Sequence, residues 1–195
     1  MNYTRIKIVI IFFTIINWFC EDSNLGEDDI VDYGLVINEI NYNSVDNFDT
    51  GDWIEIYNNS DNSIDLSNWL LKDDNDDHIF TIPQNTFLSP DKYIVFCKDT
   101  TKLKSLYPLI NNIYGDFDFG FGSDNDIVRI FDSNGVLVDI VEYLDESPWP
   151  LLPDGGGATL ELKNPSLDNS LHQNWLSSDG YGTPGQVNSI YDGDQ

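Results

Sequence analysis

The sequence predicts an all-β sandwich with one short helix, on the basis of three observations. Short runs rich in Ile, Val, Tyr, Phe and Trp recur along most of the chain, separated by clusters of Asn, Asp, Ser and Gly. Helical spacing appears in one short segment. No internal repeat is visible, which argues against a propeller or a solenoid. The 195 residues leave room for one domain of ordinary size once a targeting segment is removed.

The first 20 residues have the pattern of a signal peptide. Arg5 and Lys7 precede an apolar run over residues 8–19. At about 12 residues the run is shorter than the roughly 20 that a membrane-spanning helix needs. Cys20 ends the run, so residues 1–20 also resemble a bacterial lipoprotein signal with Cys20 as the lipidated residue, except that Phe19 stands where a small residue is usual. Secretion without a lipid is the alternative, although no Ala-x-Ala-like cleavage site follows the run.

Residues 21–32 are polar and acidic, and they predict a flexible tether. Removing the first 19 residues takes away two of the nine basic residues and none of the 34 acidic ones, which leaves a formal net charge of −27. Such a surface repels nucleic acid and anionic lipid headgroups, and it attracts divalent cations and basic proteins. A simpler interpretation is that the charge keeps the protein soluble outside the cell. We therefore expect no nucleic-acid partner, and membrane attachment only through a lipid on Cys20.

The globular domain is predicted to cover residues 33–188. In its second strand Ile54 and Ile56 share one face, whereas Trp53, Glu55 and Tyr57 share the other, as expected for a strand with one face in the core. Eight segments have this kind of composition. They are residues 35–42, 52–57, 69–72, 79–82, 93–98, 126–131, 136–143 and 159–162.

The connections support the same architecture. Residues 132–135, Asp-Ser-Asn-Gly, tolerate positive φ and predict a hairpin between the strands on either side. Residues 99–107 predict the one helix, which Pro108 ends. After residue 162 the chain is rich in Asn, Ser, Gly and Pro but keeps large apolar residues, so we expect it to wrap an edge of the sandwich. Residues 189–195 are predicted to be a disordered tail.

Several of these segments, taken in order, resemble the bacterial form of the lamin tail domain family. Asn68 and Asp91 stand where the family has Gly, and both residue types tolerate left-handed turns. The matching segments are Val-Ile-Asn-Glu-Ile-Asn-Tyr-Asn at residues 36–43, Asp-Trp-Ile-Glu-Ile-Tyr-Asn at 52–58, and the segments at 64–73, 80–83, 88–95, 149–150, 154–155, 158–162 and 165–169.

The resemblance implies an immunoglobulin-like β-sandwich. In bacteria such domains accompany secreted nucleases, hydrolases and spore-coat-kinase-like proteins as accessories, and here we expect the domain to stand without a catalytic partner. The resemblance therefore implies a non-catalytic, secreted or surface-anchored binding or adhesion module. Its partner would be an envelope protein, a polysaccharide or a second copy of the chain.

The residues needed for catalysis are scarce. The two histidines, His78 and His172, belong to no His-x-x-x-His or Cys-x-x-Cys pair, which disfavours a zinc site. No Gly-x-Ser-x-Gly elbow or phosphate-binding loop is present. We expect no enzyme, and an extracellular hydrolase is the least favoured alternative because an acidic chain contains many carboxylate pairs by composition alone.

An acidic turn over residues 73–77 is the candidate calcium site, because carboxylate and amide oxygens are the ligands that a hard cation prefers. The spacing differs from that of an EF-hand: His78 stands where the Gly would be and Gln84 where the bidentate Glu would be. A solvated hairpin turn is the competing interpretation. We expect no cofactor other than calcium at this turn, with the ligands Asp73, Asp74, Asn75 and Asp77.

Two further groups of residues have alternative interpretations. Trp53, Trp69 and Trp149 are expected to pack in the core, or else to form an exposed platform for a sugar. Glu39 and Glu55 match recurrent family positions, and strand pairing, bonding to loop amides and metal binding each explain them. A calcium-dependent structural protein and a carbohydrate-binding surface protein are accordingly the alternatives to the binding module. Cys97 is expected to be a lone buried thiol if Cys20 carries a lipid.

Overall fold

The computed structural model describes residues 32–193. The predicted signal peptide, nearly all of the tether, and Cys20 lie outside the described residues. Within residues 32–193, no helix has the length and apolar character needed to cross a membrane.

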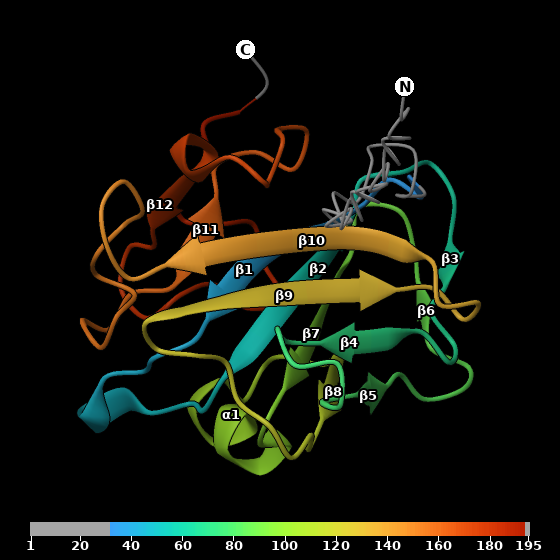
Figure 1. The fold of residues 1–195 in the computed structure, drawn as a ribbon, viewed down its shortest axis with the longest axis horizontal. Coiled ribbons are helices and arrows are strands. Elements are labelled where there is room, and N and C mark those ends of the chain that lie inside the picture. The colour runs from blue at the N-terminus through green and yellow to red at the C-terminus, as the bar shows by residue number, and fades with distance from the viewer. Residues whose placement is uncertain (1–31, 194–195) are drawn as a thin grey trace, which may run out of the picture.

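The described chain forms an all-β sandwich with one short helix, as predicted (Figure 1). A six-stranded sheet has the order β12-β11-β1-β2-β7-β8, and a four-stranded sheet has the order β10-β9-β4-β5. A third pair, β3 with β6, closes one end. The strands are β1 (Leu35–Asn41), β2 (Trp53–Asn58), β3 (Ile64–Asp65), β4 (Leu70–Lys72), β5 (Phe80–Thr81), β6 (Phe87–Leu88), β7 (Tyr93–Cys97), β8 (Ile113–Gly115), β9 (Asn125–Phe131), β10 (Leu137–Leu144), β11 (Leu160–Leu162) and β12 (Trp175–Ser177), and the helices are α1 (Thr100–Leu106) and the two 3-10 turns Asp46–Phe48 and His172–Asn174.

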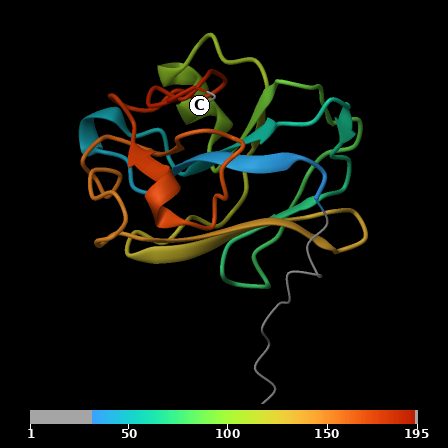
Figure 2. The same ribbon diagram turned by 90° about the horizontal axis from the view of Figure 1, so that it is seen from above.

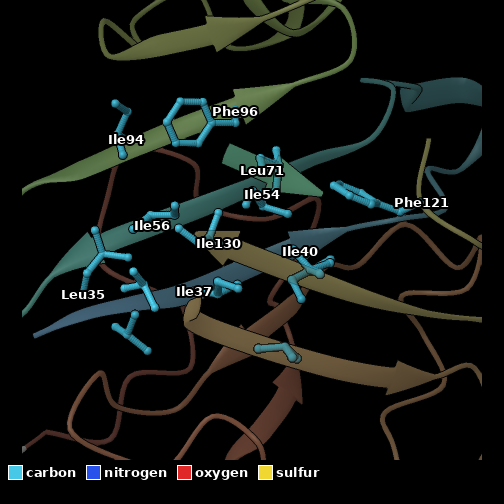
Figure 3. Close-up of a cluster of buried hydrophobic side chains, with 14 of the residues drawn as sticks. Leu35, Ile37, Ile40, Ile54, Ile56, Leu71, Ile94, Phe96, Phe121 and Ile130 are labelled. Atoms are coloured by element: carbon cyan, nitrogen blue, oxygen red, sulfur yellow. The ribbon is translucent and has the colours of Figure 1, made fainter. Parts of the chain in front are cut away.

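The main core lies between the two sheets. Aliphatic side chains from β1, β2 and β7 meet those of β4 and β9, and Figure 3 shows Ile37, Ile54 and Ile130 within this layer. All three side chains are fully buried. Burying a side chain of this size contributes roughly 1.5–3 kcal/mol, so this layer accounts for much of the stability.

The six-stranded sheet is buried on both faces, whereas the sequence pattern predicted one buried face. β1 is buried along its whole length. Figure 2 shows β9 and β10 on one side of the sheet, and α1 with the C-terminal segment on the other. We call the second side the outer face. There Trp53 packs with Val95, Cys97 and Leu103 in a second apolar cluster.

The eight predicted strands are all present, and each end lies within one residue of its predicted position. Asn68 and Asp91 have φ values of 63° and 56°, as expected for residues that replace turn glycines. Gly135 has a φ of 80°, and its N–H donates to the Asp132 carbonyl at 3.0 Å, which confirms the hairpin between β9 and β10. The strands missed by the prediction are β3, β6, β8 and β12, each of two or three residues.

A carboxylate joins the two sheets at one edge. Asp139 on β10 accepts hydrogen bonds from the Ile37 N–H of β1 at 2.6 Å and from the Asn169 side-chain amide at 2.8 Å. Burial raises the pKa of Asp139 to about 6. The two sheets are therefore held together by polar contacts as well as by the core.

Candidate functional site

Three glutamates form a row on the outer face of the six-stranded sheet. Glu39 on β1 is the register partner of both Glu161 on β11 and Glu55 on β2. All three side chains are fully buried. Burial and mutual repulsion raise the free energy of the charged forms of these carboxyl groups. The hydrogen-bonding neighbours therefore decide how the three groups are stabilised.

The C-terminal segment, residues 178–193, supplies most of those neighbours. Glu39 Oε1 accepts from the Thr183 N–H at 3.0 Å. Glu55 Oε2 accepts from the Gly185 N–H at 2.5 Å. Glu161 accepts from the Thr183 and Ser189 hydroxyls, each at 2.7 Å. The glutamate row thus fixes the C-terminal segment to the sheet, and bonding to loop amides, one of the three explanations given for Glu39 and Glu55, is confirmed.

The segment continues beyond the predicted domain boundary. The Ile190 N–H donates to Glu161 at 3.2 Å, and the Asn164 side-chain amide donates to the Gly193 carbonyl at 3.0 Å. Residues 189–193, which the sequence placed in a disordered tail, make these contacts with the domain.

Two members of the row, Glu39 and Glu55, bind protons more tightly than ordinary carboxyl groups do. Burial, followed by the charges of Glu55 and Glu161, raises the pKa of Glu39 well above its usual range. Burial raises the pKa of Glu55 to about 8. Glu39 Oε2 has no hydrogen-bond partner among the described residues. This oxygen is the one expected to carry the proton.

Despite their raised pKa values, these carboxyl groups lack the features of a catalytic site. Raised pKa values mark candidate acids and bases, but a general acid must reach its substrate. Here the C-terminal segment covers the row, and its hydrogen bonds occupy four of the six carboxyl oxygens. Within residues 32–193, no group of three or more His, Cys, Asp or Glu side chains is placed to hold a metal ion.

A pocket of about 310 Å³ lies beside the row, between β2, β7 and the C-terminal segment. Tyr57 and Tyr93 are register partners whose ring centroids are 4.8 Å apart, and Tyr191 from the C-terminal segment completes the aromatic lining. The Tyr57 hydroxyl donates to Asp91 at 3.0 Å. Most of the other lining residues are Asn or Ser. Aromatic rings and side-chain amides therefore meet in this concave surface.

The floor of the pocket is tied to the row through Asn38. Its side-chain amide donates to Glu55 at 3.0 Å and to Asn188 at 2.9 Å. Asn188 in turn donates to the carbonyls of Asn38 and Leu162, at 3.0 and 2.8 Å. Asn38 Oδ1 is buried and has no hydrogen-bond partner among the described residues. The pocket and the glutamate row therefore share one hydrogen-bond network.

The acidic turn proposed for calcium lies elsewhere, between β4 and β5. Asp73 is buried, and its carboxylate binds His78 Nδ1 at 2.6 Å and the Asn75 N–H at 2.9 Å. This carboxylate raises the pKa of His78. Asn75 Oδ1 accepts from the Asp77 N–H at 3.0 Å, while Asp74 is exposed. The turn's own donors use these oxygens, and calcium binding there stays a prediction without geometric support.

The remaining candidate residues are structural. Trp53, Trp69 and Trp149 are buried, which confirms core packing and removes them as a platform for sugar. His172 is exposed and packs edge-on against Trp149. Cys97 is buried and, within residues 32–193, is a free cysteine whose pKa burial raises to about 12.

Sequence reasoning missed Glu161 and the tyrosines of the pocket. The signal for Glu161 was present, because it lies between Leu160 and Leu162 in a strand and so faces away from their side of the sheet. Glu39 and Glu55 share this feature. Nothing local in the sequence shows that the C-terminal segment covers all three.

A family model of known proteins agrees with this fold. The family model described as Lamin Tail Domain matches residues 32–145. A crystal structure of a DUF4876 family protein from Bacteroides thetaiotaomicron resembles the chain with a TM-score of 0.48 and 10% sequence identity, over 76% of this chain and 68% of that one. No curated protein matches the sequence.

Proposed function

Because the chain belongs to the lamin tail domain family and has its immunoglobulin-like β-sandwich, we propose that it is a non-catalytic binding module. One observation carries the proposal. Glu39 and Glu55, which have raised pKa values, are covered by the C-terminal segment, whereas the pocket beside them is lined by aromatic and amide side chains. Buried acids fix the fold, and the pocket offers groups suited to recognition.

The proposed partner is a component of the cell envelope, either a protein or a polysaccharide, with self-association as the further alternative. Two features support a partner outside the cytoplasm: the signal-like first 20 residues and the strongly acidic composition. The acidic surface favours neutral or basic partners over anionic ones.

The binding function is tested with the chain from residue 21 to residue 195 immobilised as bait. Exposed to an envelope extract, it should retain one component that survives washing at moderate salt, and a Tyr191→Ala bait should retain less of it. Phe87→Ala, which alters an exposed aromatic residue on β6 outside the pocket, serves as the control. If the native chain retains nothing from envelope, periplasmic and medium fractions and stays monomeric, the proposal is wrong.

We propose in addition that the protein is exported, and that it is then either secreted or held to the envelope by a lipid on Cys20. Intact-mass measurement of the protein from the membrane fraction tests this directly. The expected mass is that of residues 20–195 with acyl groups added, and Cys20→Ser should move the protein out of that fraction. An unmodified mass in the membrane fraction would exclude the lipid, and a mass that includes residues 1–19 would exclude cleavage.

A further inference from the structure

We infer that the pocket beside the glutamate row binds a neutral saccharide. This inference rests on the proposed binding function and names its ligand class and its site. The pocket volume of about 310 Å³ is at the small end for ligand sites, which suits about one or two sugar rings.

The aromatic lining supplies the apolar half of such a site. Sugar rings present C–H groups on one face, and tyrosine rings are the side chains that cover such faces while leaving a hydroxyl at the rim. Tyr57 and Tyr93 stand side by side on neighbouring strands, with an angle of 39° between their rings. Tyr191, which is 41% exposed, faces the same pocket from the C-terminal segment.

The polar lining supplies the other half. The side-chain amide of Asn59 and the hydroxyl of Ser166 line the pocket, and each kind of group can both donate to and accept from a sugar hydroxyl. Among the described residues that line the pocket, none is Lys, Arg or His. A phosphate or carboxylate ligand would find no opposite charge there, in a protein that already has a large negative charge.

A buried acceptor marks the floor of the pocket. Asn38 lines the pocket and is only 1% exposed, yet its Oδ1 has no hydrogen-bond partner among the described residues. A buried polar atom without a partner costs free energy, and a hydroxyl donor on a bound sugar would remove that cost. The two amide protons of Asn38 already bind Glu55 and Asn188, which fixes the direction of Oδ1.

Calorimetric titration of the native chain with soluble neutral glycans tests the inference. The probes are a β-glucan, a mannan, a xylan and a galactan, with an acidic glycan and choline as the anionic and cationic alternatives. At least one neutral glycan should bind. Tyr93→Ala and Tyr191→Ala should weaken that binding by about tenfold or more, which corresponds to about 1.4 kcal/mol. Phe87→Ala should leave it unchanged, and thermal melts confirm that each variant is folded.

The possible outcomes separate this inference from the proposed function. If no neutral glycan binds but the bait retains an envelope protein, the saccharide inference fails and the binding module stands. If choline or the acidic glycan binds and neutral glycans do not, the ligand class is wrong. If a neutral glycan binds equally well to Tyr191→Ala, which changes an exposed side chain and should fold, the assignment of the site is wrong.

Discussion

The free energy of unfolding is expected to fall by about 3 kcal/mol between about pH 6 and about pH 9. Glu55 has its pKa raised from 4.5 to about 8, and that of Glu39 is raised as well. A raised pKa means that the folded state holds its proton where the unfolded state has lost it. The stabilisation that comes from this retained proton is complete below the pKa of the unfolded state. It is lost as the pH rises through the pKa of the folded state, at about 1.4 kcal/mol per pH unit.

Other groups change the stability at lower pH. Burial raises the pKa values of Asp52 and Asp139 to about 6. The stabilisation that each contributes is therefore lost as the pH rises toward 6, in the same direction as that of Glu55 but at lower pH. Asp49 and Asp65 have lowered pKa values and act in the opposite direction in more acidic solution. His78, whose pKa is raised by its hydrogen bond to Asp73, acts in the same direction above pH 6, so the decline there reports on the glutamate row together with His78.

Urea unfolding at constant ionic strength measures this decline, and a charge-removing variant assigns it. Glu39→Gln keeps an oxygen that can accept from Thr159 and Thr183, and it places an amide where Oε2 has no partner. It should match the native chain near pH 6 and exceed its stability near pH 9. Glu142→Gln, at an exposed position on β10, should not change the slope. A stability that is level or rising from pH 6 to pH 9 would show that the row is not protonated.

Gly182→Ala is expected to destabilise the fold by about 3 kcal/mol or more. Gly182 has a φ of 94°, which alanine adopts only with strain. A Cβ at this position would also meet Glu39 Oε1 and lie 2.7 Å from Thr159 Cγ2. Because the row and the strand beneath it cannot yield easily, the C-terminal segment would have to lift from the sheet.

Gly180→Ala separates the strain from the contact. Gly180 lies in the same segment with a φ of 77°, and a Cβ there would meet nothing within 4 Å. We expect it to cost about 1 kcal/mol, the usual penalty for alanine in this conformation. Equal unfolding free energies for the two variants would mean that close contact between Gly182 and the row does not hold the segment.

The sequence predicted most of the fold because the signals for it were local. Alternation of apolar residues located the long strands, and Asn68, Asp91 and Gly135 marked turns with positive φ. The short strands escaped because two or three residues carry no periodicity. β8 is an extreme case, since it pairs in parallel with β7 at an edge and depends on a contact formed by the whole sheet.

The candidate site was harder to predict, because it is built from residues far apart in the chain. Glu39 and Glu55 drew attention as strand residues, but their meaning depends on Thr183 and Gly185, more than a hundred residues away. Conversely, the acidic turn at residues 73–77 looked like a metal site in sequence, yet the side-chain oxygens of Asp73 and Asn75 are used by His78 and by main-chain N–H groups. Partners distant in sequence decide the role of a buried carboxylate.

Protonated glutamates hold the C-terminal segment against the sheet, and this segment forms one wall of the pocket. Hydrogen exchange of residues 178–193 tests this claim most directly. Protection factors, corrected for the intrinsic pH dependence of exchange, should be high near pH 6, should drop near pH 9 in the native chain, and should drop less in Glu39→Gln. Protection of this segment that is the same at both pH values, or equally lost in Glu39→Gln, would contradict the account.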